Sequence, residues 1–341
     1  MTLDQWNILK KCARCEDITQ IPTGLIIDSP WLPGYAGIST LDYFTDVNKW
    51  FDINMKVVNE YPEVIFIPGF WVEYGMAAEP SGYGCLVNFF EGQTPTVQHI
   101  ANNCKDAIQF NSPNPEKDGL MPLILNIYKN VEKKVNDNGH RIKIVAARGP
   151  LTLASHLISV TAFLMDIKLD PENAHKLLKK TTATVKNWLT AQANVLQEAE
   201  AILVLDDIVG FLSKEDYMEF AHPYLKEIFD AFPDSMKIYH NDTNNSVYYE
   251  LLEDLGVNIF NLSHLINIKK ARELVGNKIC LLGNIPPLDM LVNGTEEQVK
   301  NEVKKCLDDY SGNTGLILSA GGGVSPGTKK ENLQAMLAYK N

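Results

Sequence analysis

The sequence lacks an excess of basic residues, since its 341 residues include 42 aspartates and glutamates but 31 lysines and arginines, a formal charge of −11. Phosphate binding requires basic stripes, so we expect no nucleic-acid partner. The chain also has no apolar run of the about 18 residues that span a membrane. Its first residues are not a basic segment followed by an apolar one. These absences predict a cytoplasmic protein that does not bind a membrane.

Closely spaced cysteines and glycine-rich nucleotide motifs are also scarce. Cys12 and Cys15 have C-x-x-C spacing, but no second pair follows, which argues against a zinc or redox site. In a cytoplasmic chain of this size we expect the six cysteines to be free thiols. No G-x-G-x-x-G follows the early apolar runs, and the three glycines at 321–323 are not followed by Lys-Ser/Thr. Both absences weaken dinucleotide- and phosphate-binding interpretations.

Short apolar, β-rich runs alternate with amphipathic helical stretches at 171–197, 214–232 and 295–310. Such alternation predicts parallel strands with crossover helices, and eight units in about 300 residues match a (β/α)₈ barrel of the α/β class. A doubly wound sheet is the alternative. No linker interrupts the pattern, so we expect a single domain over 1–341, with the first twenty residues as a helical extension against the barrel. The eight runs are 24–28, 64–69, 142–147, 201–206, 236–240, 257–262, 278–284 and 315–320.

Polar residues follow several of these runs, at the strand ends where such barrels build their sites. The run 236–240 ends in His240, followed by Asn241 and Asp242. His240 and Asp242 are two residues apart, so both project to one side of an extended backbone and can share a metal ion. Capping of the next helix is the alternative. Asp206 and Asp207 point to opposite sides, so only one of them can face the barrel mouth.

For two other candidates, Cys280 and His156, packing in the core is the better interpretation. Cys280 precedes Asn284 by four residues on the same strand face, but it lies roughly 13 Å deeper along an extended strand. That depth favours a buried core thiol over a ligand. His156 comes early in an apolar helix, where a packing histidine is the better interpretation.

Four segments, taken in order, resemble the uroporphyrinogen decarboxylase superfamily over essentially the full length of the chain. They are 149–154 (GPLTLA), 212–224 (LSKEDYMEFAHPY), 283–287 (GNIPP) and 321–323 (GGG) with the trailing Pro326. The resemblance implies a (β/α)₈ barrel with its site at the C-terminal face. The decarboxylases of this superfamily bind a tetrapropionate macrocycle through an arginine-rich N-terminal motif and use a catalytic aspartate after the second strand.

The decarboxylase pattern is not complete in this chain. The corresponding N-terminal stretch, 27–35, contains no arginine, and 67–70 (IPGF) replaces the segment with the aspartate. Without arginine partners the substrate carboxylates would be poorly bound. The other branch of the superfamily contains corrinoid-dependent methyltransferases, zinc enzymes that move methyl groups between small molecules and a cobalamin-carrying protein. Residues 79–85 (EPSGYGC) resemble their pattern after the second strand.

The metal-binding pattern of this branch is altered. Its coenzyme M members have H-x-C after the fifth strand and a further cysteine after the eighth, whereas this chain has His240-Asn241-Asp242 and Gly321-Gly322. Two thiolates suit a site that holds a substrate thiolate, but a histidine with carboxylates leaves zinc a stronger Lewis acid, suited to an ether oxygen. The resemblance therefore favours an aryl methyl ether:corrinoid protein methyltransferase. Coenzyme M-type (thiol) and methylamine-type transfer are the alternatives, and decarboxylation is less favoured.

The resemblance also implies a set of site residues and partners. Zn²⁺ is expected on His240 and Asp242, with Asp207 or Cys280 completing the site. The partners are a small-molecule methyl donor and a corrinoid protein that carries the cobalamin. The donor, the direction of transfer and the choice between monomer and homodimer remain open. The residues expected to bind the substrate, with barrel-lid packing as the alternative for the aromatic ones, are Asp28, Trp31, Tyr35, Phe70, Trp71, His264 and Asn284.

Overall fold

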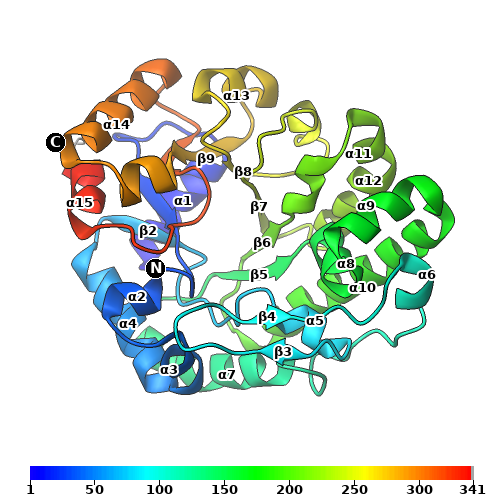
Figure 1. Ribbon diagram of the computed structural model, residues 1–341. Coiled ribbons are helices and arrows are strands. Elements are labelled where there is room, and N and C mark those ends of the chain that lie inside the picture. The colour runs from blue at the N-terminus through cyan, green and yellow to red at the C-terminus, as the bar shows by residue number, and fades with distance from the viewer. Residues whose placement is uncertain (339–341) are drawn as a thin grey trace.

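Eight parallel strands form a barrel with helices around it (Figure 1), in a computed structural model that describes residues 1–338. Neighbouring strands follow the order β2-β1-β10-β9-β8-β7-β6-β5. Each predicted run overlaps one of these strands, so the (β/α)₈ prediction is confirmed. The strands are β1 (Thr23–Ile26), β2 (Val64–Ile67), β5 (Ile144–Arg148), β6 (Ala201–Leu205), β7 (Met236–Asn241), β8 (Ile259–Leu262), β9 (Cys280–Ile285) and β10 (Leu316–Ala320).

Hydrogen bonding stops at one seam of the barrel, between β2 and β5. Within the described range 1–338 no strand pairing joins these two strands. Ile65 and Ile67 of β2 nevertheless lie in the same buried cluster as Ile144 and Ala146 of β5, so the core continues across the seam. The barrel is therefore nearly closed. The long connection between the two strands carries α5 (Ala78–Gly82), the hairpin strands β3 (Val87–Asn88) and β4 (Thr96–Val97), α6 (Cys104–Ala107) and α7 (Met121–Asp137).

Most predicted helices form where the apolar periodicity places them. The stretch predicted as one helix over 214–232 is divided into α11 (Lys214–Phe220) and α12 (His222–Asp230). Pro223 explains the division, because proline lacks an N–H and suits the first turn of a new helix. The remaining helices are α2 (Leu32–Ala36), α3 (Thr40–Thr45), α4 (Val47–Glu60), α8 (Pro150–Ile158), α9 (Val160–Leu169), α10 (Pro171–Val195), α13 (Ile268–Val275), α14 (Glu296–Tyr310) and α15 (Lys330–Ala338).

The N-terminal helix α1 (Leu3–Ala13) closes the barrel at the strand starts, as predicted. It begins with a capping box between Thr2 and Gln5. The Gln5 side chain donates to the carbonyl of Val64, the first residue of β2, at 2.9 Å. Trp6 and Cys12 are buried in the same cluster as the barrel interior. A site at the C-terminal face therefore lies at the end of the barrel away from α1.

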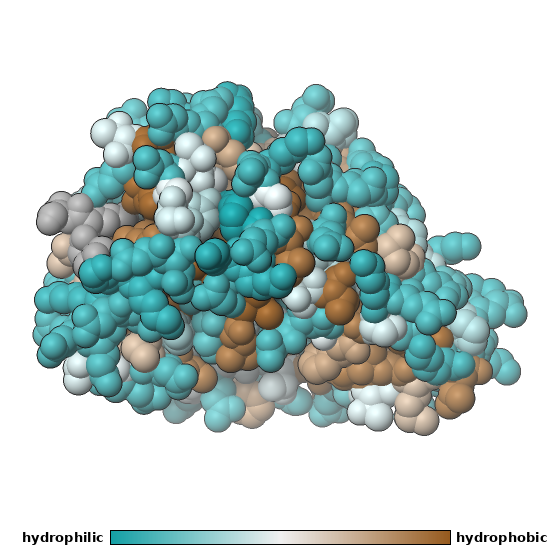
Figure 2. Space-filling view, turned by 90° about the horizontal axis from the view of Figure 1, so that it is seen from above, coloured by the Kyte–Doolittle hydropathy of each residue, from teal (hydrophilic) through white to brown (hydrophobic). Residues whose placement is uncertain are grey.

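The outer surface is mainly polar on the side shown in Figure 2, where the hydrophobic residues form separate patches. Within the described part of the chain no single helix is both long and apolar enough to cross a membrane. Only α8 and α9 taken together reach the required length and composition, and they meet at a bend of 105°.

Candidate metal centre

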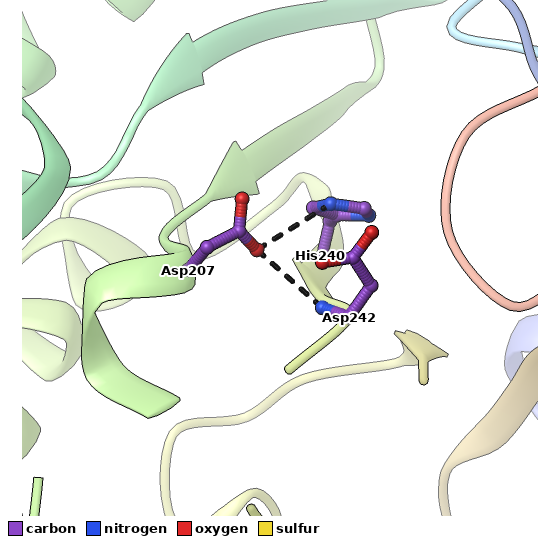
Figure 3. Close-up of side chains that lie close together, drawn as sticks. All are labelled: Asp207, His240 and Asp242. Carbon is purple, nitrogen blue, oxygen red and sulfur yellow. Dashed lines mark hydrogen bonds and ion pairs between the residues drawn. The ribbon is translucent and has the colours of Figure 1, made fainter. Parts of the chain in front are cut away.

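Asp207, His240 and Asp242 meet at the C-terminal end of the barrel (Figure 3). His240 is the penultimate residue of β7, Asp242 directly follows that strand, and Asp207 opens a short 3₁₀ turn after β6. One ligand atom from each residue lies within 4.8 Å of the other two. The His240 Nε2 atom lies 3.5 Å from Oδ1 of Asp207. The structure thus brings together two neighbouring strand ends, as the strand-end pattern predicts.

The two aspartates after β6 have separate roles. The carboxylate of Asp206 points away from the pocket and accepts hydrogen bonds from the backbone N–H groups of Leu151 and Thr152, at 3.0 and 2.9 Å. The Thr152 hydroxyl donates to the same carboxylate at 2.7 Å. Asp206 therefore caps α8, and Asp207 is the one that faces the barrel mouth.

The imidazole of His240 is held in one tautomer. Its Nδ1 lies 2.6 Å from Oδ1 of Asn261. The Asn261 amide nitrogen donates to the carbonyls of Leu282 and Ala320, at 2.7 and 3.3 Å, so the oxygen of this side chain must be the atom that faces His240. Nδ1 therefore carries a proton, and Nε2, which faces Asp207, is the nitrogen placed to bind a metal. Metal-binding histidines are commonly oriented by such a partner.

The triad offers a donor set suited to a divalent cation. No lysine or arginine forms an ion pair with Asp207 or Asp242 within the described residues. Burial of Asp207, together with the charge of Asp242, raises the pKa of the Asp207 carboxyl. A bound cation would relieve both effects. One neutral imidazole nitrogen and two carboxylates fit Zn²⁺, and they leave coordination positions open.

Gly322 leaves room for the carboxylate of Asp242 in the metal centre. Gly322 has a φ of +124°, and a Cβ atom there would lie 2.5 Å from Oδ2 of Asp242. The Asp242 carboxylate therefore fills the space in which a side chain at position 322 would begin. A side chain at position 322 would therefore require the Asp242 carboxylate to move from its present place.

Asn261 gives a direct test of the imidazole orientation. Replacing Asn261 with leucine removes the acceptor for Nδ1, so both tautomers become accessible and the metal affinity is expected to fall about tenfold. Competition with a chromophoric chelator measures the change. Asn126→Leu, at an exposed position on α7, is the control and should leave the affinity unchanged. An Asn261→Leu protein with wild-type affinity would show that the imidazole needs no such orientation.

A pocket of about 460 Å³ opens beside the triad. Its apolar walls come from β1, β6 and the connection between β2 and β5, through Ile26, Leu205, Met76, Pro95 and Val97. Its polar lining, besides the triad, includes Asp28, Arg148 and His156. The volume lies within the roughly 300–1,000 Å³ of small-molecule sites.

Asp28 lies in this pocket, as the strand-end pattern indicates. Burial of its carboxyl group and the nearby charge of Glu73 raise the pKa of Asp28 to about 7, although Arg148 and His240 act in the opposite direction. The Glu73 carboxylate is itself fixed by the backbone N–H groups of Ser29, at 2.8 Å, and of Gly75. The pocket wall therefore includes a carboxyl group that ionises less readily than a free aspartate.

The predicted aromatic wall is not present, because these rings pack in the core. Trp31 is 1% exposed and stacks on Tyr35, with ring centroids 4.5 Å apart. The Tyr35 hydroxyl donates to Glu60 at 2.7 Å, outside the pocket. Phe70 is fully buried. Trp71 lies in the barrel interior, and the guanidinium of Arg148 lies over its ring, 5.4 Å from the ring centroid.

Three further predicted residues also lie away from the pocket lining. Cys280 is the first residue of β9 and contacts Cys12 of α1, so it lies at the closed end of the barrel and does not complete the metal site. Asn284 donates to the carbonyls of Ser263 and Ile266, at 3.2 and 2.6 Å, so its side chain is held by the connection between β8 and α13. His264 packs against Gly321, where a Cβ atom would lie 2.4 Å from its backbone nitrogen.

Arg148 and His156 are pocket residues that the sequence interpretation missed. The predicted run ended at residue 147, whereas β5 includes Arg148 as its last residue. Reading one residue further would have added this arginine to the strand-end set. His156 was assigned to core packing, but one face of α8 borders the pocket and carries this side chain there.

Comparisons with known proteins agree with this architecture. Residues 34–340 match the family described as uroporphyrinogen decarboxylase (URO-D). The uroporphyrinogen decarboxylase of Chlorobium luteolum is 33% identical over 327 residues, covering 91% of this chain and 89% of the relative. That of Vesicomyosocius okutanii is 26% identical over 267 residues, covering 76% of this chain and 74% of the relative.

A solved structure described as a methyltransferase from Methanosarcina mazei superposes with a TM-score of 0.80 over 98% of both chains. At 19% identity this similarity demonstrates a shared fold. The fold and the sequence match together lead to one assignment: the chain belongs to the uroporphyrinogen decarboxylase family.

Proposed function

We propose that this protein transfers a methyl group from an aryl methyl ether to the cob(I)alamin of a partner corrinoid protein, with Zn²⁺ at the metal centre. The observation that carries the proposal is the triad of Asp207, His240 and Asp242 beside a small pocket. The fixed Nε2 lone pair and two carboxylates are the ligands of a Lewis-acid site, and the two thiolates of a thiol-binding site are absent from it.

Decarboxylation of a tetrapropionate macrocycle is a weaker candidate, although the relatives compared above are named uroporphyrinogen decarboxylases. The pocket of about 460 Å³ suits one aromatic ring better than four linked pyrroles. It contains one arginine, Arg148, and the carboxyl groups of Asp28, Asp207 and Asp242. Several substrate carboxylates would meet mainly like charge there.

The proposed roles of the chain's own groups follow from the site. Nε2 of His240 and the carboxylates of Asp207 and Asp242 would hold the metal, and Asn261 keeps the imidazole oriented. The bound metal would supply Lewis acidity at the ether oxygen, whose negative charge grows as the methyl group leaves. Met76, Pro95 and Val97 provide an apolar surface for the arene and exclude water from the metal side.

The partner's corrinoid must approach from outside the barrel. The interior is filled by side chains such as Ile26, Ile65, Leu203 and Ile317, so no macrocycle can enter from below. Methyl transfer requires the cobalt to come within bonding distance of the methyl carbon. We therefore expect a corrinoid protein to dock over the pocket and to be a better acceptor than free cob(I)alamin.

The function is tested by mixing the zinc-loaded protein, a reduced corrinoid protein and one methyl donor at a time. We expect the cob(I)alamin spectrum to change to that of methylcobalamin with methoxyarenes, and to persist with trimethylamine or methanethiol. Removal of the metal should stop the conversion, and added zinc should restore it. Turnover with methanethiol alone would support the thiol-type alternative. Equal rates with free cob(I)alamin and with the corrinoid protein would remove the case for a docking surface.

A further inference from the structure

Arg148 presents unused hydrogen-bond donors to the pocket. Its guanidinium is anchored by one hydrogen bond from Nη2 to the carbonyl of Gly75, at 3.1 Å, and by the ring of Trp71. The residue is 7% exposed and lines the pocket. Within residues 1–338 no carboxylate lies at ion-pair distance from it. Burial raises the pKa of the nearby carboxyl groups of Asp28, Glu73, Glu79 and Asp207, and the charge of Arg148 acts in the opposite direction, but none of them takes its remaining N–H donors, which a ligand carboxylate could accept.

The acidic groups around Arg148 do not use its remaining donors. The Glu73 carboxylate accepts from the backbone of Ser29 and Gly75 instead. Asp28 responds to the positive charge of Arg148, which lowers the pKa of this carboxyl, but Asp28 forms no ion pair with it. Glu79 accepts from the Arg148 backbone N–H at 2.9 Å, which fixes the end of β5 and leaves the guanidinium free.

His156 adds a neutral polar group to the same wall. Its Nε2 lies 3.3 Å from the sulfur of Met76, and the side chain lines the pocket. Burial, followed by the charges of Arg148 and His99, lowers the pKa of His156 to about 4. The imidazole is therefore uncharged at neutral pH and can donate a hydrogen bond without bringing a second positive charge. Arg148 and His156 line the same pocket, and the charge of the arginine is one of the effects that lower the pKa of His156.

We propose that Arg148 and His156 form a carboxylate-binding subsite in the pocket, and that the methyl donor is a methoxyarene that carries a carboxylate. The planar guanidinium fork matches a carboxylate with two parallel hydrogen bonds. Asp207 and His240 line the same pocket, so one aromatic acid can reach both the metal ligands and the subsite. The identification of the donor rests on the proposed function, whereas the subsite itself does not.

Benzoate tests the subsite without any methyl transfer, because it has no methyl group to give. We expect the full-length zinc-loaded protein to bind benzoate in a calorimetric titration, and Arg148→Met to weaken binding by about tenfold or more. Binding of methoxybenzene, which has no carboxylate, should change less than about twofold. Arg14→Met removes the same charge at an exposed arginine that pairs with Glu16, and should leave benzoate binding unchanged.

A second measurement does not depend on a variant that folds. Benzoate beside His156 should raise the pKa of this imidazole, which an NMR titration of the wild-type protein detects. Arg148→Lys keeps the charge but loses the planar fork, so its benzoate affinity should fall between wild type and Arg148→Met. Equal benzoate binding by wild type and Arg148→Met, with no shift of the His156 titration, would overturn the subsite.

The two proposals fail in different ways. Benzoate binding that depends on Arg148, without methyl transfer from any methoxybenzoate, would leave the subsite standing and contradict the demethylation. Methyl transfer from methoxybenzene and from 4-methoxybenzoate with equal kcat/KM would contradict the carboxylate-bearing donor and leave the demethylation standing. We expect 4-methoxybenzoate to be preferred, and Arg148→Met to abolish the preference by raising KM for this substrate alone.

Discussion

Replacing His240 with alanine is expected to remove the bound metal and to lower the rate of methyl transfer by about 10³-fold or more. His240 supplies the only nitrogen ligand of the triad, and its imidazole is fixed by Asn261. Without this ligand, only the carboxylates of Asp207 and Asp242 would remain to hold the metal. Zinc per chain, measured by mass spectrometry after dialysis, and the rate with a methoxyarene give the two readouts.

The fold of the His240→Ala protein should survive. His240 lies at the open end of the barrel, above the interior cluster that α1 closes from the other side. The loss of one side chain there should lower the melting temperature by only a few degrees, about what 1–2 kcal/mol represents in a chain of this size. His175→Ala, at a histidine on α10 that contacts Tyr224, is the matched control and should keep both metal and activity.

Two outcomes would contradict the ligand assignment. If the His240→Ala protein retains one zinc per chain, the metal is bound elsewhere. If the wild-type protein carries no metal after growth with zinc and still transfers methyl groups, Lewis acidity at this site is not part of the reaction. A variant that loses zinc and unfolds would place the metal among the structural elements of the barrel, contrary to its position at the mouth.

The sequence predicts the barrel well because its signal is distributed over many residues. Each strand combines a short apolar run with a following helix, and a shift of one or two residues leaves the assignment intact. The spacing of His240 and Asp242 is equally robust, since it depends only on extended backbone at the end of β7. The same local geometry explains why Asp206 and Asp207 separate to opposite sides.

The parts of the site that the sequence did not predict depend on long-range packing. Trp31 and Tyr35 come soon after β1, but Tyr35 bonds to Glu60 of α4 and the Trp31 indole donates to the carbonyl of Thr328, and nothing in the local sequence specifies these directions. Arg148 was missed because the predicted run was one residue too short. Asn284 was misplaced because its side chain is held by two carbonyls of the connection between β8 and α13, a contact distant in the sequence. The core position of Cys280, in contrast, agrees with the sequence, because the depth of this residue along its strand favoured a buried thiol.

Replacing Gly322 with alanine is expected to weaken metal binding by about 100-fold, although the new side chain is a single methyl group. Its Cβ atom would lie 2.5 Å from Oδ2 of Asp242, so the carboxylate must move away from His240 and Asp207. The φ of +124° adds backbone strain for any residue with a side chain, which costs about 1–3 kcal/mol of folding free energy. Chelator competition and chemical denaturation measure the two effects separately.

A double-mutant cycle separates the displacement of Asp242 from the backbone strain. Asp242→Ala removes the group that the new methyl would touch, so adding Gly322→Ala to Asp242→Ala should cost stability but no further metal affinity. Gly34→Ala, where no atom lies within 4 Å of the added Cβ, is the control for a glycine substitution. Wild-type zinc affinity in the Gly322→Ala protein would mean that Asp242 is not a ligand. Two independent losses of affinity in the double variant would mean that Gly322 acts on the site by a route other than the Asp242 carboxylate. The expected result, one shared loss, would show that Gly322 acts on the metal centre by leaving the Asp242 carboxylate in its place.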